Sequence, residues 1–160
     1  SFARETPRER MPVHIDDVVR NVLLLVSVEL RRQNVRLVPE LKSATLVVAQ
    51  PNALEQVVLN LVTNAVEAMP DGGDIRITTA RTGNRVELVV GDTGRGIPAE
   101  QLPHIFEPFF TTKASGTGLG LSVSYGIVED HKGTIEVQSE PGKGTTFVLT
   151  FPAEEVVALS

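Results

Sequence analysis

Two asparagines, Asn60 and Asn64, lie one turn apart in a segment whose pattern predicts a helix. Its apolar residues recur every three or four positions, so they fall on one helical face. The opposite face is polar, and its residues are Gln56, Asn60, Thr63, Asn64 and Glu67. A solvated face usually carries Lys, Arg and Glu, which form helices well, whereas Asn forms them poorly. Residues 51–69 contain no Lys or Arg, so the face is either an unusual solvated surface or a functional one.

A carboxylate followed by two glycines forms the next candidate. Asp92 comes directly after an apolar segment, residues 86–90, that is typical of a buried strand. Asp and Gly are common in turns, so an ordinary turn is one interpretation. The other is a ligand site, in which Asp92 accepts a hydrogen bond from an exocyclic amine while Gly94 and Gly96 let the backbone approach closely. Adenine carries such an amine where guanine carries a carbonyl, so an acceptor-only carboxylate would select adenine.

A second glycine segment, with Gly116, Gly118 and Gly120, opens a predicted helix. Backbone N–H groups at such a helix start bind anions. The spacing differs from the dinucleotide motif G-x-G-x-x-G. A P-loop is also absent, because Lys143 is followed by Gly144 rather than by Ser or Thr.

An anion site would give the asparagines a role. Side-chain amide oxygens are neutral ligands that suit Mg²⁺ without adding negative charge beside a phosphate chain. Asn64 could bind the metal through its oxygen, with Asn60 and Glu67 ordering water or the surrounding ligands.

The totals limit the class of protein. A chain of 160 residues with 41% hydrophobic and 22% charged residues fits one globular domain. A net charge of -5 disfavours a nucleic-acid surface, and the absence of cysteine excludes disulfides and thiolate metal sites. The apolar runs are too short to span a bilayer, so we expect no membrane contact by this domain.

The order of predicted elements indicates an α+β two-layer sandwich, with a mixed β-sheet covered on one face by helices. Asp16 is predicted to cap the first helix and Asn34 to close it. The predicted helices cover residues 16–32, 52–68 and 119–130, and the predicted strands cover 35–38, 45–49, 74–80, 85–91, 134–139 and 145–151. We divide the chain into a linker or end of a missing domain (1–12), one domain (13–152) and a C-terminal tail (153–160).

Four motifs in this order resemble the ATP-binding domain of two-component sensor histidine kinases, within the Bergerat-fold superfamily of gyrase, chaperone and mismatch-repair ATPases. "NLVTNAVEAM" (60–69) resembles the N box, "GDTGRGIP" (91–98) the G1 box, "IFEPFFTTK" (105–113) the F box and "GTGLGLSV" (116–123) the G2 box. The segment "GKGTTFVLTFP" (142–152) resembles the closing strand. The sequence around the F and G2 boxes is most similar to the nitrogen-regulatory and oxygen-sensing branch of these kinases.

The resemblance implies roles for individual residues. Asn64, with Asn60 one turn earlier, would bind Mg²⁺, and Asp92 would bind the adenine of ATP. Residues 98–115 would form an ATP lid that Phe106, Phe109 and Phe110 anchor. The complete set of nucleotide-binding residues it implies is Asn60, Asn64, Asp92, Gly94, Gly96, Ile97, Phe110, Thr112, Lys113, Gly116, Thr117, Gly118, Leu119, Gly120 and Thr145.

The resemblance also implies partners. These kinases phosphorylate a histidine that is followed by an acidic residue on a separate dimerisation domain. His14, His104 and His131 are followed by Ile, Ile and Lys, so each is expected to be a surface or lid residue. The chain is therefore expected to be a cytoplasmic domain of a parent protein that is soluble or membrane-anchored. It would bind ATP, act on a missing phosphoacceptor domain and serve a response-regulator receiver domain, with no catalytic base of its own.

Three rival functions remain open. A chaperone- or gyrase-type ATPase would carry a catalytic Glu where this chain has Asn60, so hydrolysis should be feeble here. A serine kinase acting on regulatory proteins would differ in the residue it labels. The third rival is a degenerate, non-catalytic interaction module. The intact Asn64, Asp92 and G2 glycines argue against it.

Overall fold

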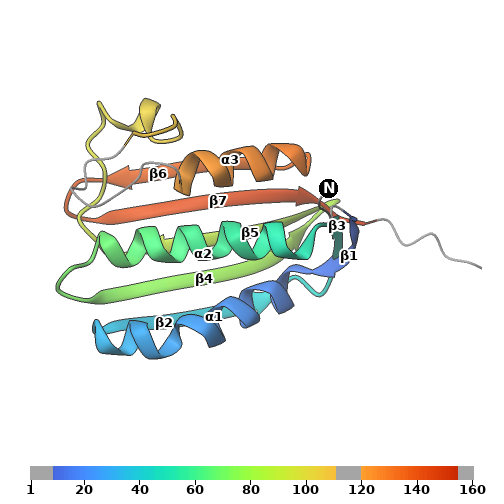
Figure 1. The fold of residues 1–160 in the computed structure, drawn as a ribbon, viewed down its shortest axis with the longest axis horizontal. Coiled ribbons are helices and arrows are strands. Elements are labelled where there is room, and N and C mark those ends of the chain that lie inside the picture. The colour runs from blue at the N-terminus through green and yellow to red at the C-terminus, as the bar shows by residue number, and fades with distance from the viewer. Residues whose placement is uncertain (1–8, 111–119, 155–160) are drawn as a thin grey trace, which may run out of the picture.

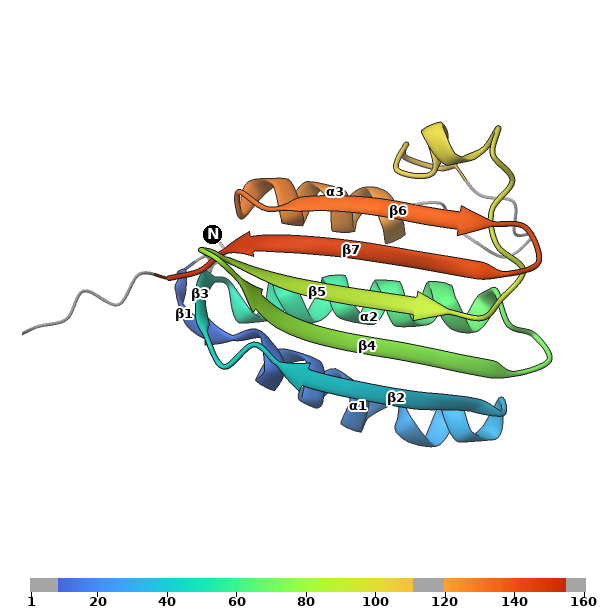
Figure 2. The ribbon, with the colours of Figure 1, turned by 180° about the vertical axis from the view of Figure 1, so that it is seen from behind.

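The computed structural model describes residues 9–110 and 120–154, and these form two layers. Figure 1 shows the helices side by side in front of one β-sheet, and Figure 2 shows the uncovered face of the sheet from behind. The described helices are α1 (Ile15–Arg32), α2 (Pro51–Glu67) and α3 (Gly120–Asp130), with a short 3-10 helix η2 (Leu102–His104). The strands are β1 (Met11–His14), β2 (Val35–Lys42), β3 (Leu46–Ala49), β4 (Gly73–Thr82), β5 (Arg85–Asp92), β6 (Thr134–Glu140) and β7 (Gly144–Pro152). The predicted α+β sandwich is confirmed.

The main sheet has five strands in the order β2-β4-β5-β7-β6. The predicted hairpins β4–β5 and β6–β7 are antiparallel, as is the β5–β7 pair, whereas β2 and β4 are parallel. A parallel pair cannot be joined by a tight turn. The chain crosses from β2 to β4 through β3 and α2, and this crossover places α2 over the sheet (Figure 1).

The apolar face of α2 packs on the sheet as its periodicity predicts. The buried residues of this helix are Leu54, Val57, Val58, Leu61, Val62 and Ala65. They share one core with the inward side chains of the central strands, which are Ile75, Ile77, Leu88, Val90, Phe147 and Leu149. Burial of one face fixes the rotation of α2, so Asn60 and Asn64 must point away from the sheet.

The N-terminal boundary differs from the sequence prediction. Met11 and Pro12 belong to β1, which pairs antiparallel with β3 in a separate two-stranded sheet. Along the described residues, which start at residue 9, regular structure therefore begins within the segment assigned to a linker. Two prolines and a polar composition favour a linker locally, but the pairing with β3 depends on residues far along the chain.

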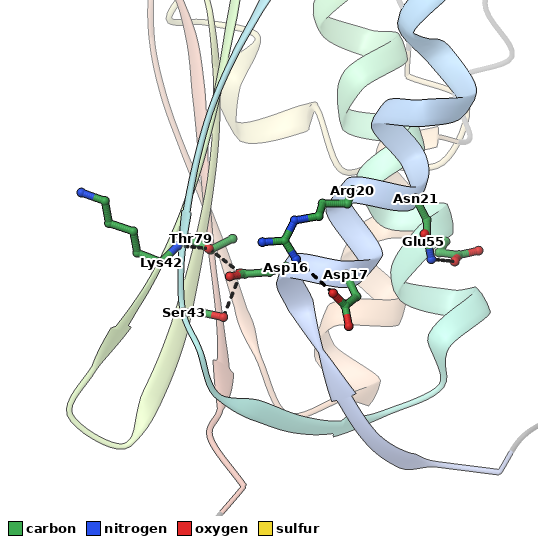
Figure 3. Close-up of polar contacts among 8 residues, drawn as sticks. All are labelled: Asp16, Asp17, Arg20, Asn21, Lys42, Ser43, Glu55 and Thr79. Carbon is green, nitrogen blue, oxygen red and sulfur yellow. Dashed lines mark hydrogen bonds and ion pairs between the residues drawn. The ribbon is translucent and has the colours of Figure 1, made fainter.

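The role predicted for Asp16 is wrong, because this residue lies inside α1 and does not cap it. His14 occupies the N-cap position and makes no side-chain cap hydrogen bond. Figure 3 shows the Asp16 side chain turned toward the sheet. Its Oδ1 accepts hydrogen bonds from Ser43 Oγ (2.8 Å) and Thr79 Oγ1 (2.5 Å). Asn34, in contrast, closes α1 as predicted, with a φ of 60° that Asn tolerates better than most residues.

We expect Asp16→Ala to lower the free energy of unfolding by about 1–3 kcal/mol, because it leaves buried hydroxyl groups without an acceptor. Ser43 and Thr79 are each only 2% exposed. The matched control is Asp17→Ala in the same turn, where the side chain is exposed and bonded to Arg20. That change should cost less than about 1 kcal/mol. Urea unfolding measures both, and equal losses would contradict a special role for Asp16.

Candidate functional site

Asp92 ends β5 at the edge of the sheet where β7 begins. Gly91 pairs with Thr146 in the antiparallel register, so the start of β7 lies beside the Asp92 carboxyl group. Asp92 Oδ1 accepts hydrogen bonds from the backbone N–H groups of Gly94 (2.8 Å) and Thr145 (3.3 Å). Within the part of the chain that the structure describes, Oδ2 accepts none. Two backbone donors therefore fix the carboxyl group and leave one oxygen to accept a hydrogen bond from a ligand.

The environment of Asp92 opposes its ionisation. Partial burial raises the pKa of this carboxyl above its ordinary value, and the hydrogen bonds from Gly94 and Thr145 lower it by less. Keeping the Asp92 carboxyl group ionised therefore costs free energy in the folded protein. Costs of this kind are common at functional sites.

Ser139 holds the segment after Asp92 against the β6–β7 hairpin. Its Oγ accepts a hydrogen bond from Ile97 N (2.7 Å), donates to Gly144 O (3.1 Å) and lies 2.8 Å from Thr145 Oγ1. Thr145 is 4% exposed. Ser139 belongs to no motif and looks like an ordinary polar strand residue, so the sequence alone does not predict this role.

Gly94 and Gly96 are required by contacts within the protein. A Cβ atom at Gly94 would lie 2.5 Å from Ala68 O, at the end of α2, and one at Gly96 would lie 2.1 Å from Glu140 O. Gly96 also has a φ of +75°, which other residues rarely adopt. These glycines seat the Asp92 loop between α2 and the β6–β7 turn, and their contact with a base stays a prediction.

Asn60 joins α2 to the first turn of α3. Its Nδ2 donates to Gly120 O (3.0 Å) and Ser124 Oγ (3.1 Å), and its Oδ1 accepts a hydrogen bond from Gln56 Nε2 (2.7 Å). The structure thus brings the N box next to the last glycine of the G2 box. Asn64 lies one turn further along α2, half-buried, on the turn that leads to Ala68 and the Asp92 loop.

The residues described here include no cluster of three His, Asp or Glu that could hold a metal ion. The amide oxygens of Asn64 and Asn60 suit Mg²⁺ chemically, although Asn60 Oδ1 already accepts one hydrogen bond. A neutral pair of this kind binds a divalent ion well only when a ligand adds anionic oxygens. The site therefore fits a metal that arrives with a polyanion.

The phenylalanines of the F box have different environments. The Phe106 ring packs against Tyr125 and Phe147, with centroid distances of 5.2 and 6.3 Å, and Phe110 lies 6.1 Å from the His104 ring. Both are partly buried against the core. Phe109 is 72% exposed, so its predicted role as an anchor is wrong. Thr112, Lys113, Gly116, Thr117, Gly118 and Leu119 lie outside the described residues.

His131 is buried and structural, not the surface or lid residue that the sequence predicted. It is 5% exposed. Its Nδ1 lies 2.8 Å from Ile127 O, and its Nε2 accepts a hydrogen bond from Gln50 N (3.2 Å). A carbonyl can only accept and an N–H can only donate, so the ring is neutral with its proton on Nδ1. Nδ1 holds the ring against the last turn of α3, and Nε2 joins that turn to the residue before α2.

Comparisons with known proteins agree with this arrangement. The family described as histidine kinase-, DNA gyrase B- and HSP90-like ATPases matches residues 49–155. The chain is 43% identical over 147 residues to the sensor histidine kinase ZraS of Escherichia coli strain K12. The matched region covers 88% of this chain and 30% of ZraS. This chain thus spans less than a third of that relative.

Solved structures of the histidine kinase ThkA have the same fold. Its nucleotide-free catalytic domain superposes with a TM-score of 0.83 at 36% identity, covering 90% of this chain and 95% of that one. ThkA in complex with the response regulator protein TrrA superposes with a TM-score of 0.78 at 32% identity, covering 91% of this chain and 42% of that one.

We expect Asp92→Asn to raise the free energy of unfolding near neutral pH. The amide oxygen of Asn can still accept the bonds from Gly94 and Thr145, while the cost of burying charge disappears. The pKa of Asp92 is raised in the folded state. As the pH falls through that pKa, protonation neutralises the carboxylate, so the free energy of unfolding of the wild type should rise toward that of the variant. Urea unfolding at several pH values measures the gap, with exposed Asp71→Asn as control. A less stable variant at neutral pH would contradict the cost assigned to Asp92.

Proposed function

The chain belongs to the histidine kinase-, DNA gyrase B- and HSP90-like ATPase family and is a histidine kinase catalytic domain, and from this premise we propose how it works. It binds ATP between α2, the end of β5 and the start of α3. It then donates the γ-phosphoryl group to a histidine on another domain of its parent protein. The parent uses that phosphohistidine to phosphorylate an aspartate on a response regulator.

The observation that carries the proposal is the orientation of the Asp92 carboxyl group. Gly94 N and Thr145 N donate to Oδ1, and among the described residues no donor bonds to Oδ2, so Oδ2 can accept a hydrogen bond from a ligand. The adenine amine supplies such a donor in place of water. The guanine carbonyl at the same position would set one acceptor against another, which costs a lost hydrogen bond and repulsion. Asp92 therefore selects adenine nucleotides.

Asn64 and Asn60 would hold Mg²⁺ together with phosphate oxygens, and the bound ion would neutralise part of the phosphate charge. Asn60 Oδ1 also accepts a hydrogen bond from Gln56. Asn60 also positions the first turn of α3 through Gly120 O. The predicted phosphate-binding glycines, Gly116 to Gly120, lead into that turn. Lys113 and Thr112 would contact phosphates from the lid.

In the transfer step, a ring nitrogen of the acceptor histidine attacks the γ-phosphorus and the bond to the bridging oxygen breaks, which releases ADP. The acceptor comes from outside this chain. His131 has both nitrogens engaged, and no histidine of the sequence precedes an acidic residue. The proton of the acceptor nitrogen passes to a base that we assign to the acceptor domain.

The partners follow from the relatives. ThkA forms a complex with a response regulator, so a receiver domain is the partner that we propose for the parent protein. We place the domain in the cytoplasm, where ATP is present. Along the described residues, no helix is long and apolar enough to cross a membrane. We propose no nucleic-acid partner, given the net charge of -5.

Calorimetric titration tests nucleotide binding. We expect ADP and a non-hydrolysable ATP analogue to bind, guanine nucleotides to bind at least about 10-fold more weakly, and Asp92→Asn to weaken adenine binding by about 10- to 100-fold. Asn64→Ala should abolish the effect of Mg²⁺ on the ATP analogue. The exposed controls are Asp71→Asn and Thr63→Ala, the latter on the polar face of α2. Equal affinity for adenine and guanine nucleotides would refute the role of Asp92.

Phosphotransfer requires the acceptor domain. The helical domain of the parent is added in trans together with labelled ATP. The label should then appear as phosphohistidine, which is acid-labile, and not as phosphoserine. Without that domain, hydrolysis should stay near the uncatalysed level, because Asn60 has no basic group to activate water. Acid-stable label would favour the serine-kinase alternative, and rapid hydrolysis by the chain alone would favour the chaperone-type ATPase.

A further inference from the structure

The outward face of α1 carries an apolar patch that the nucleotide site does not explain. Leu24 and Leu25 are each 77% exposed and Val28 is 63% exposed. Residues three and four apart are neighbours on a helix, so these side chains form one continuous patch. The opposite face of α1 is buried in the core through Val18, Val19 and Val22. Figure 1 shows α1 at the edge of the helical layer, where only α2 adjoins it.

Charges of opposite sign bound the two ends of this patch. Asp17 lies in the first turn of α1, and Arg31 and Arg32 lie in its last turn. Asp17 is two turns before Leu24, and Arg32 is two turns after Leu25. The patch and its charges are thus arranged evenly about a point between Leu24 and Leu25.

We propose that this face, which we name the α1 patch (Asp17, Asn21, Leu24, Leu25, Val28, Arg31 and Arg32), binds the same face of a second copy in antiparallel orientation. A two-fold axis between Leu24 and Leu25 brings the four leucines together. It places Asp17 of each copy beside Arg31 and Arg32 of the other, so the favourable charge contact is made twice. A parallel pairing would instead set Asp17 against Asp17 and arginine against arginine.

The existing contacts of these charges do not oppose the pairing. Asp17 bonds to Arg20 (3.0 Å) and Arg32 lies 3.6 Å from Glu29, but both pairs are exposed. Exposed pairs contribute little free energy, so exchanging partners costs little. The antiparallel helix dipoles add a small favourable term, because the positive end of each helix lies beside the negative end of the other.

The pairing is weak by itself. A stable dimer buries about 800 Å² on each partner, and three exposed apolar side chains supply less than this. We therefore expect a dissociation constant of about 0.1–1 mM for the separate chains. Two chains held together elsewhere in a parent protein would pair more completely, since tethering raises the effective concentration to about the millimolar range.

Sedimentation equilibrium up to about 1 mM tests the association. We expect a reversible monomer–dimer equilibrium, and Leu25→Glu should remove it without lowering the midpoint of thermal unfolding. The matched control is Val48→Glu on β3, an exposed apolar residue (48%) outside the patch. A chain that remains monomeric at every concentration overturns the proposal. An association that Leu25→Glu does not weaken also overturns it.

Charge reversal and cross-linking test the orientation. Asp17→Arg should weaken the dimer several-fold, and adding Arg31→Asp and Arg32→Asp in the same chain should restore it. The chain has no cysteine, so under oxidation Leu24→Cys should give a disulfide-linked dimer much faster than Val48→Cys. Failure of the triple variant to restore pairing, or equal cross-linking rates, would exclude the antiparallel interface.

Discussion

The parallel pairing of β2 with β4 determines the position of every other part of the site. Because these strands cannot be joined by a turn, the chain must cross the sheet between them, and α2 lies in that crossover. The helix then ends near the end of β5, since both Gly94 and Arg95 meet Ala68. The topology therefore brings the polar face of α2 and the carboxyl group of Asp92 to one edge of the sheet. No residue in either motif could achieve this locally.

Each contact that holds the Asp92 loop has a backbone group on at least one side. Asp92 is fixed by two backbone N–H groups, Ile97 N donates to Ser139, and the loop glycines lie against carbonyl oxygens. Backbone donors have fewer alternative conformations than long side chains. The half-buried carboxylate is held in one orientation before a ligand arrives, which reduces the entropy lost on binding. The raised pKa of Asp92 has a different cause, because it comes from burial and is only partly offset by these hydrogen bonds.

Much of this structure follows from local sequence patterns. The periodicity of α2 gave its buried face correctly, the turn residues gave both hairpins, and Asn34 was correctly placed at the end of α1. The errors concern residues whose partners are distant in sequence. Asp16 has the composition of a cap but bonds to Thr79, and His131 bonds to Gln50. Three phenylalanines in a short segment look equivalent, yet only the fold decides that Phe106 meets Tyr125 while Phe109 faces outward.

The two faces of α1 illustrate why exposure has to be read together with charge. Apolar exposure alone identifies no partner, because many soluble proteins expose isolated leucines. The α1 patch has an acidic end, an apolar centre and a basic end. This order restricts the partner, because it is complementary to a second copy of the same patch in antiparallel orientation. Under the proposed function the phosphoryl acceptor lies on another domain, so transfer also depends on the concentration of other domains nearby. Weak self-pairing through the α1 patch would change how often the domain meets its acceptor. It would not alter the nucleotide site, because Asp17, Leu24 and Arg32 belong to a helix that carries none of the predicted ATP contacts.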